Sequence, residues 1–274
     1  MQKSILITGC SSGIGYAAAH DLRARGWRVF ASCRKQADCN QMIVEGFESP
    51  RLDLADEESV AEGLAEVLAA TGGTLDALFN NGAYAMPGAV EDLPRQALRE
   101  IFETNLFGTQ DLTNRVIPIM RAQGHGRIIN NSSILGLVAY KWRGAYVATK
   151  FALEGLTDTL RHEMRGTGIH IILVEPGPVT SKIRQNSIPH FERFIDWKKS
   201  VRASQYEKLL NRLYKSGAPD RFELPPSAVS KKLIHALEHP RPHARYFVTQ
   251  PTFVMNLLRR VLSTRMLDAI LSRG

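Results

Sequence analysis

The chain has 274 residues and a mass of 30.5 kDa, which is enough to bury the core of one large domain over residues 1–274. Hydrophobic residues make up 44% of the chain and charged residues 23%, a balance that excludes a disordered, collagen-like or coiled-coil protein. The net charge of +8 raises the hypothesis that the protein meets nucleic acid or a membrane surface.

Short apolar runs alternate with longer amphipathic segments along most of the chain. The apolar runs predict strands at residues 4–7, 28–32, 50–54, 75–79, 126–130, 169–174 and 244–249. The amphipathic segments predict helices at residues 16–25, 57–70, 94–121, 145–165 and 227–238, and Pro118 is expected to kink the third of these. Strands that are apolar throughout and are followed by helices indicate a parallel sheet covered on both faces. The sequence therefore predicts an α/β, doubly wound fold.

A glycine-rich loop follows the first predicted strand and leads into the first predicted helix. Gly9 permits a sharp turn, Gly13 lets the backbone approach a pyrophosphate, and Gly15 allows the helix to pack closely on the sheet. The helix N-terminus also offers unpaired N–H groups to an anion. The loop therefore predicts dinucleotide binding, with a glycine turn that holds no ligand as the alternative.

The residues after the second predicted strand indicate which dinucleotide is bound. Cys33 occupies the place where an acidic residue would select NAD, and Arg34 and Lys35 follow it. Cations at this point accommodate the 2′-phosphate of NADP, so the sequence favours NADP(H) over NAD(H); solvated loop charges are the alternative. Asp53, at the end of the third predicted strand, is expected either to hydrogen-bond an adenine edge or to cap the next helix.

Three residues suggest acid–base catalysis. Tyr146 and Lys150 are four residues apart at the start of a predicted helix, so both side chains lie on one face. A neighbouring ammonium favours the phenolate, which predicts a lowered pKa for Tyr146 and proton transfer near neutral pH. Ser133, at the end of the fifth predicted strand, has a hydroxyl that can hold a substrate oxygen. The spacing of Tyr146 and Lys150 alone occurs by chance in many helices, so the interpretation rests on the whole set of motifs.

Taken together, the motifs resemble the short-chain dehydrogenase/reductase family over the chain up to residue 250. The set comprises Thr8-Gly9-x-x-x-Gly13-x-Gly15, Asn80-Asn81-Gly82, Asn105, Ser133, Tyr146-x-x-x-Lys150 and Pro176-Gly177. The resemblance implies a Rossmann-type sheet of seven strands. It also implies hydride transfer between a nicotinamide cofactor and a carbonyl or alcohol, with no metal.

The resemblance assigns roles to these residues. Tyr146 is implied as the general acid/base, and Lys150 lowers its pKa and binds the nicotinamide ribose. Ser133 polarises the carbonyl, and Asn105 holds a water in the proton relay. Asn81 contacts the cofactor ribose, although the glycine in Asn80-Asn81-Gly82-Ala83 stands one position earlier than is usual in the family. The implied cofactor-binding residues are Gly9, Ser11, Ser12, Gly13, Ile14, Gly15, Arg34, Lys35, Asp53, Leu54, Asn81, Gly82, Tyr146, Lys150, Pro176, Gly177, Val179 and Thr180.

Within the family, the chain is similar to the retinol dehydrogenase and 17β-hydroxysteroid dehydrogenase branch and its bacterial aldehyde-reductase relatives. The similarity is carried by residues 33–35, the basic region after the sixth strand and residues 245–249. It implies a small apolar carbonyl or alcohol as substrate, and a homodimer or homotetramer. The alternative is a non-catalytic dinucleotide-binding sensor or scaffold, which loss of Tyr146 or Lys150 would have favoured.

Residues 182–225 form a basic insertion after the sixth predicted strand, with helical spacing and several aromatic residues. The aromatic residues are Phe191, Phe194, Trp197, Tyr206 and Tyr214. Ligands of doubly wound proteins bind at the carboxyl ends of the strands, so an insertion at this point is expected to lie over the site. We therefore predict that residues 182–225 form a substrate lid.

The positive charge is confined to the last third of the chain. Residues 1–181 hold 17 basic and 20 acidic side chains, whereas residues 182–274 hold 18 and 7. No recognition motif accompanies the charge, so nucleic-acid binding is not expected. A basic amphipathic helix is predicted at residues 253–271, within a C-terminal segment of residues 252–272. It either docks on the domain or a partner subunit, or makes peripheral membrane contact.

Cysteine usage and hydropathy bear on location. Cys10, Cys33 and Cys39 are odd in number and close together in the sequence, which argues against a disulfide framework and for a reducing compartment. We find neither a secretory signal pattern nor a run of roughly 20 apolar residues. We therefore expect a cytoplasmic protein, membrane-associated if the C-terminal helix binds lipid.

Overall fold

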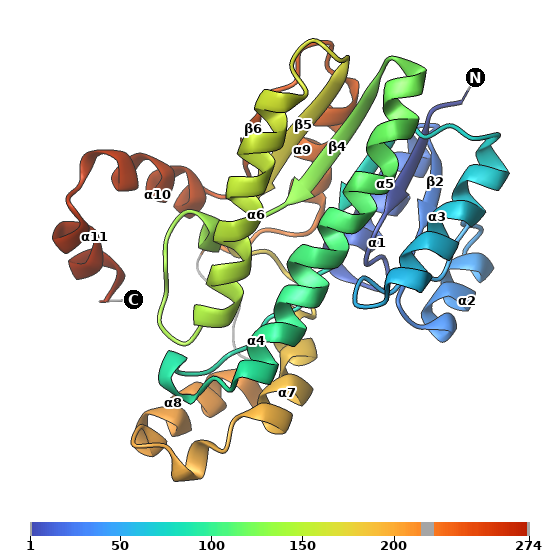
Figure 1. The fold of residues 1–274 in the computed structure, drawn as a ribbon. Coiled ribbons are helices and arrows are strands. Elements are labelled where there is room, and N and C mark those ends of the chain that lie inside the picture. Colours follow the sequence, from blue (N-terminus) through green and yellow to red (C-terminus); the bar gives the residue numbers. More distant parts are fainter. Residues whose placement is uncertain (1, 215–221, 273–274) are drawn as a thin grey trace.

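A computed structural model of the chain describes residues 2–214 and 222–272. Its centre is one parallel sheet of six strands in the order β2-β1-β3-β4-β5-β6 (Figure 1). The strands are β1 (Ser4–Ile7), β2 (Arg28–Ala31), β3 (Ala77–Asn80), β4 (Gly126–Asn131), β5 (Ile169–Glu175) and β6 (Arg245–Phe247). The expected doubly wound α/β architecture is confirmed, because helices pack on both faces of this sheet.

Two hydrophobic layers hold the helices against the sheet. One face is covered by α1 (Gly13–Ala24), α2 (Gln36–Val44) and α9 (Ser227–Glu238). The opposite face is covered by α3 (Glu57–Thr71), α5 (Gly108–Gln123) and α6 (Gly144–Glu163). Because every strand runs in the same direction, the loops after the strands meet at one edge of the sheet.

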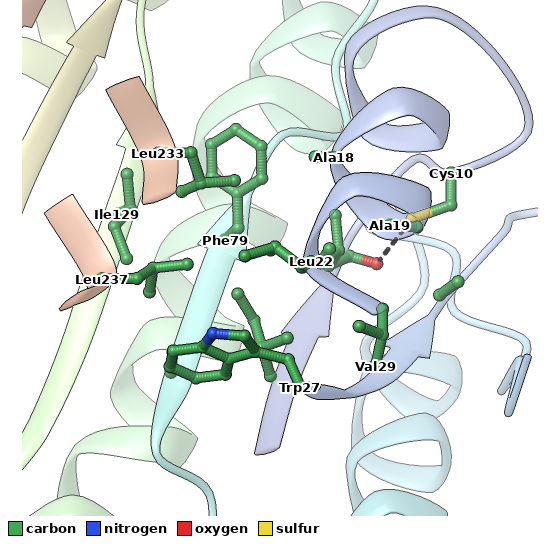
Figure 2. Close-up of a cluster of buried hydrophobic side chains, with 14 of the residues drawn as sticks. Cys10, Ala18, Ala19, Leu22, Trp27, Val29, Phe79, Ile129, Leu233 and Leu237 are labelled. Atoms are coloured by element: carbon green, nitrogen blue, oxygen red, sulfur yellow. Dashed lines mark hydrogen bonds between the residues drawn. The ribbon is translucent and has the colours of Figure 1, made fainter. Parts of the chain in front are cut away.

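The layer between α1, α9 and the sheet fixes the start of the glycine loop. Figure 2 shows Leu22 of α1, Phe79 of β3 and Leu233 of α9 packed together in this layer. On the same side, the thiol of Cys10 donates to the carbonyl of Ile7 at 3.3 Å. All three cysteines are buried free thiols, as the absence of a disulfide framework required. Packing at this point therefore holds the end of β1 and the start of α1 in a fixed relation.

The expected third strand at residues 50–54 is wrong, and the sheet has six strands instead of seven. This segment makes only isolated bridges with the end of β2, namely Phe30 with Glu48 and Cys33 with Arg51. Pro50 lies between the two bridges and has no N–H to donate to a ladder. The chain therefore runs alongside β2 without forming a regular strand.

The helix predicted over residues 94–121 is interrupted, although not at Pro118. It consists of α4 (Arg95–Phe102), a π-helical turn (Glu103–Phe107) and α5, which continues through Pro118 to Gln123. The interruption contains Asn105, one of the implied catalytic residues. Such π-turns occur frequently at functional sites.

The lid segment, residues 182–225, is helical as predicted in the part that the structure describes. It contains α7 (Ile183–Phe194), a 3₁₀ turn (Trp197–Lys199) and α8 (Ala203–Tyr214); residues 215–221 of the prediction lie outside the described residues. Phe191 and Tyr206 are fully buried between these helices. The lid segment therefore has a buried hydrophobic cluster, which it shares with Ala89 outside the segment.

The single helix predicted over residues 253–271 is wrong, because two helices are present. They are α10 (Gln250–Val261) and α11 (Thr264–Leu271). Leu262 between them is extended, and the hydroxyl of Ser263 accepts a hydrogen bond from the N–H of Met266 at 3.4 Å. A serine side chain that caps the second helix favours a break at this point.

Substitution of Gly108 tests the close approach of α5 to residues 50–54, where the third strand was expected. A β-carbon on Gly108 would lie 1.7 Å from the carbonyl oxygen of Leu54. We expect Gly108→Ala to lower the free energy of unfolding by about 1–3 kcal/mol, because the backbone must shift. Urea denaturation followed by circular dichroism measures this change.

Gly155→Ala is the matched control, because a β-carbon on this α6 residue would meet no atom within 4 Å. Replacing an unobstructed helical glycine by alanine stabilises by about 0.5–1 kcal/mol. Equal effects of the two substitutions would contradict the packing described.

Candidate active site

The residues predicted to form the site meet at the carboxyl edge of the sheet. The glycine loop follows β1, Asn81 follows β3, Ser133 follows β4 and Pro176 follows β5. Tyr146 and Lys150 reach the same edge from the first turns of α6, where both are buried. Among the described residues no group of three or more His, Cys, Asp or Glu side chains is placed to hold a metal ion.

The glycine loop has the geometry expected of an anion cradle. Gly9 and Gly13 have φ angles of 73° and 62°, which L-residues with side chains rarely adopt. A β-carbon on Gly15 would lie 2.4 Å from the carbonyl oxygen of Gly9. Ser12 precedes α1 but makes no side-chain cap, and the first turn holds no acidic residue. The N–H groups at this end of the helix therefore have no side-chain cap. No acidic residue in the first turn would repel an anion that binds to them.

The remaining loop residues differ in environment. Ser11 is exposed, whereas Ile14 packs against the hydrophobic layer under α1. These positions are compatible with backbone contacts to a ligand from the loop.

Thr8 and Asn81 brace the glycine loop against the end of β3. The Thr8 hydroxyl accepts hydrogen bonds from the N–H groups of Asn81 at 2.9 Å and Gly82 at 2.8 Å. The Asn81 side-chain amide donates to the carbonyl of Thr8 at 2.9 Å, and its oxygen accepts from the side chain of Asn131 at 2.9 Å. The structure therefore gives the Asn81 side chain a positioning role in the loop, while its predicted ribose contact stays a prediction.

Asn131 was not singled out by the sequence, although it connects two parts of the site. Its side chain donates to Asn81, and its carbonyl accepts from the Lys150 ammonium at 2.7 Å. A polar residue that ends an otherwise apolar strand was the available sequence signal. Asn131 thus ties the glycine loop to the catalytic face of α6.

The Ser133 hydroxyl lies close enough to the Tyr146 phenol to lower the pKa of that phenol. The Ser133 hydroxyl accepts from the N–H of Leu135 at 3.1 Å, which caps the 3₁₀ turn Ile134–Gly136. This cap fixes the serine side chain in the neighbourhood of Tyr146. The structure thus brings the two residues together, while their implied roles stay predictions.

The expected lowering of the Tyr146 pKa is wrong for the protein without ligands. Burial raises the pKa of this phenol to about 12, and only Ser133 and the charge of Arg143 lower it. Burial also lowers the pKa of Lys150 to about 8, while the charge of Glu154 raises it. The Lys150 ammonium lies 5.5 Å from the centre of the Tyr146 ring. Desolvation is the largest cause of both shifts because both side chains are almost completely buried.

Asn105 locks the π-turn to the active-site face of α6. Its side chain accepts from the N–H of Tyr84 at 3.0 Å and donates to the carbonyl of Tyr84 at 2.9 Å. It also donates to the hydroxyl of Thr149 at 3.3 Å. Asn105 is therefore placed beside the helix that carries Tyr146 and Lys150, and its implied contact with a water stays a prediction.

The segment after β5 closes the other side of the site. The carbonyl of Pro176 accepts from the N–H of Ile134 at 2.7 Å, next to Ser133. A β-carbon on Gly177 would lie 2.1 Å from the hydroxyl of Thr249. Thr180 is exposed, and its hydroxyl donates to Glu223 at 2.7 Å, while Val179 forms a bridge with Leu224 at the end of the lid segment.

The residues predicted to select the dinucleotide lie at the end of β2. Cys33 is buried, whereas Arg34 and Lys35 are exposed. The charge of Arg34 lowers the pKa of His190 on α7, which indicates that the Arg34 side chain faces the lid segment.

Asp53 was expected either to contact an adenine edge or to cap the next helix. Helix α3 is capped by Asp56, whose carboxylate accepts from the N–H groups of Glu58 and Ser59 at 3.1 and 3.3 Å. Asp53 instead accepts from the N–H of Ala55 at 3.1 Å, and Leu54 is buried beside Gly82. The helix-cap interpretation of Asp53 is therefore wrong, and the adenine contact stays a prediction.

A buried charge network extends from Lys150 to β6, and sequence reasoning did not identify it. Arg245 forms ion pairs with Glu154 and Glu175, and with Asp158 at 2.6 Å. Burial, with the neighbouring Glu154, raises the pKa of Glu175 to about 8. Glu154 lies one helical turn beyond Lys150, so it is the carboxylate of this network that raises the pKa of Lys150.

Comparison with known proteins agrees with this geometry. A family model described as short chain dehydrogenase matches residues 3–191. The uncharacterized oxidoreductase YbbO of Escherichia coli K12 is 40% identical over 271 residues, which cover 99% of this chain and 94% of that protein. The chain belongs to the short-chain dehydrogenase/reductase family. It is an oxidoreductase of that family, whose members act on CH–OH or carbonyl groups and bind a nicotinamide dinucleotide.

A further sequence relative and a solved structure are also similar to this chain. Human 17β-hydroxysteroid dehydrogenase type 1 is 30% identical over 267 residues, covering 90% of this chain and 77% of that protein. The crystal structure of a short-chain dehydrogenase from Streptomyces avermitilis has a TM-score of 0.80 at 27% identity, covering 100% of this chain and 99% of that chain. The expected similarity to the retinol and 17β-hydroxysteroid dehydrogenase branch is confirmed.

The influence of Glu154 on Lys150 gives a direct prediction. In protein labelled with ¹³C-lysine, we expect the Lys150 side chain to titrate with a pKa of about 8, below its ordinary value, because of burial. Glu154→Gln should lower this pKa further, because removal of a nearby negative charge disfavours the ammonium. The signal is assigned by its loss in Lys150→Arg.

Asp158→Asn is the control for this titration. It also removes a carboxylate from Arg245, but Asp158 is not among the groups that shift the pKa of Lys150. A Lys150 signal that titrates identically in the wild-type and Glu154→Gln proteins would contradict the proposed influence.

Proposed function

We propose that the protein is an NADP(H)-dependent oxidoreductase that interconverts an aldehyde or ketone and an alcohol on an apolar substrate, with Tyr146 as the general acid/base. One observation carries the proposal. The neighbouring Ser133 and Tyr146 side chains lie at the edge of the sheet beside a glycine cradle that is suited to a dinucleotide. Homodimer or homotetramer assembly and a cytoplasmic location stay predictions.

The residues present fit a dinucleotide phosphate. The uncapped N-terminus of α1 and the backbone around Gly13 would hold the pyrophosphate, because the N–H groups there attract an anion. The absence of a side chain at Gly15 allows the helix end to approach the loop this closely. Arg34 and Lys35 would meet the 2′-phosphate, since both are exposed and Cys33 brings no carboxylate to repel it. Lys150 would hold the nicotinamide ribose. These features support NADP(H) over NAD(H).

The protein groups supply orientation and a proton. When bound, the cofactor supplies or accepts the hydride. The Ser133 hydroxyl holds the substrate oxygen, and the Tyr146 phenol donates a proton to it during reduction. A pKa of about 12 keeps this phenol protonated at neutral pH, so it is ready to act as an acid. Lys150, cationic below pH about 8, stabilises the phenolate that remains.

An apolar substrate is supported by the surroundings of Tyr146. Its ring belongs to a hydrophobic cluster with Tyr84 and Met86, and Phe194 of the lid segment packs against that cluster. His190 of α7 stacks on Tyr84 with ring centres 3.9 Å apart. The lid segment thus brings the aromatic rings of Phe194 and His190 to the cluster around Tyr146, which supports an apolar substrate.

Turnover of graded carbonyls tests this function. We expect NADPH oxidation with aldehydes of increasing chain length, retinal or keto-steroids, and a rate that rises with apolar surface. Tyr146→Phe should reduce turnover about a thousandfold, because the proton donor is lost, while NADPH affinity changes little.

Two outcomes would count against the assignment. Retained activity in Tyr146→Phe contradicts the acid role of the phenol. Tight NADPH binding by the wild-type protein without turnover of any carbonyl would instead favour the sensor or scaffold.

A separate prediction concerns the choice of cofactor. Arg34→Ala should weaken NADPH binding on the order of tenfold or more and leave NADH binding nearly unchanged, because only NADPH carries the phosphate. Fluorescence titration with both dinucleotides measures the two affinities. Arg165→Ala, at an exposed position near the opposite edge of the sheet, is the control for the loss of one positive charge. Equal losses for NADPH and NADH would show that Arg34 does not bind the phosphate.

A further inference from the structure

The last two helices form an arm that lies outside the hydrophobic layers of the fold. We call α10 and α11, residues 250–271, the C-terminal arm. Figure 1 shows the arm projecting beyond β6 and away from the sheet. Helix α10 buries only Thr252 and α11 buries no residue, whereas α9, of the same length as α10, buries five. The expected docking of this segment on its own domain is therefore limited in extent: α10 meets the 3₁₀ turn Ile134–Gly136 and the carbonyl of Leu137 without burying its apolar side chains.

The arm exposes an unusual amount of apolar surface. Six of its apolar side chains are exposed, from 41% for Ile270 to 67% for Val261. They are Phe253, Val254, Leu257, Val261, Met266 and Ile270. Phe253, Leu257 and Val261 are four residues apart, so their side chains lie on one face of α10 and form an exposed apolar stripe, which marks an interaction site.

Positive charge accompanies the apolar surface. The arm carries three arginines, Arg259, Arg260 and Arg265, against the single acidic residue Asp268. Amphipathic helices with this combination lie in the interface of an anionic bilayer, where apolar burial and cationic attraction add. No helix among the described residues is long and apolar enough to cross a bilayer, so contact would be with the surface.

We propose that the C-terminal arm binds the surface of an anionic lipid bilayer through its exposed apolar side chains and its arginines. Pairing of two arms from two copies is disfavoured, because it would bring six arginines together with only two aspartates to compensate them. An anionic headgroup layer compensates the same cations without any change of the arm. Charge complementarity therefore selects the membrane as the occupant.

The arm is attached beside the catalytic serine. Helix α10 contacts the 3₁₀ turn that Ser133 caps, and the Arg259 guanidinium donates to the carbonyl of Leu137 at 3.4 Å. Binding of the arm would hold this edge of the molecule near the lipid in which apolar carbonyls accumulate. This consequence rests on the proposed function, whereas the binding itself does not.

Sedimentation with lipid vesicles tests the proposal on the full chain, without dinucleotide or substrate. The probes are vesicles of phosphatidylcholine alone and vesicles of equal parts phosphatidylcholine and phosphatidylglycerol. We expect the wild-type protein to bind the mixed vesicles more tightly, and the double variant Leu257→Asp/Val261→Asp to bind them at least about tenfold more weakly. Arg260→Gln/Arg265→Gln should reduce the preference for phosphatidylglycerol.

The matched control is Ile43→Asp/Val44→Asp at the end of α2, where two apolar residues are 52% and 82% exposed. It adds the same charge on another surface and should bind vesicles like the wild type. Failure of the wild type to bind either vesicle, or equal weakening in both double variants, overturns the proposal. A dimer in solution that Leu257→Asp/Val261→Asp abolishes, without vesicle binding, would identify a second copy as the occupant instead.

Turnover of a water-soluble aldehyde by the same variants separates this proposal from the proposed function. The arm variants should retain that activity, because no residue of the arm is part of the Ser133–Tyr146 pair. Loss of vesicle binding with retained turnover therefore concerns the arm alone.

Discussion

The active site depends on the hydrogen bonds that Asn131 makes from the end of β4. Its side chain donates to Asn81, which in turn supports Thr8 and the glycine loop, and its carbonyl holds the Lys150 ammonium. The ends of three neighbouring strands and the first turns of α6 are thereby held in one arrangement. Asn131 thus connects the glycine loop to α6 through its side-chain amide and its carbonyl, whereas its buried side-chain oxygen has no hydrogen-bond partner.

Burial determines the acid–base properties of this site more strongly than the pairing of tyrosine and lysine does. Removal from water raises the pKa of Tyr146 and lowers that of Lys150, because burial disfavours the charged form of each group. Ser133 lowers the pKa of Tyr146 and Glu154 raises the pKa of Lys150, so both residues oppose the effect of burial. The carboxylates around Arg245 thus extend the electrostatics of the site well beyond the residues that touch a substrate.

The basic last third of the chain serves the periphery of the site. The lid segment has a buried hydrophobic cluster and carries Phe194 to the cluster around Tyr146. The C-terminal arm, in contrast, leaves six of its apolar side chains exposed. The net charge of +8 therefore resides mainly in elements that surround the catalytic edge and says little about the chemistry.

The sequence by itself determined the parallel α/β architecture, because apolar strands and amphipathic helices are encoded by the order of neighbouring residues. The glycine loop, Ser133, Tyr146 and Lys150 were identified for the same reason, since their spacing is local or motif-bound. Only the tertiary structure decided the features that depend on distant contacts. Pro50 and Ser263 are local signals against a regular third strand and a continuous C-terminal helix, whereas the π-turn at Asn105 is held by Tyr84 and Thr149, which are distant in the chain. The direction of the Tyr146 pKa and the support given by Asn131 likewise follow from burial and from partners far away in the chain, which residue order does not specify.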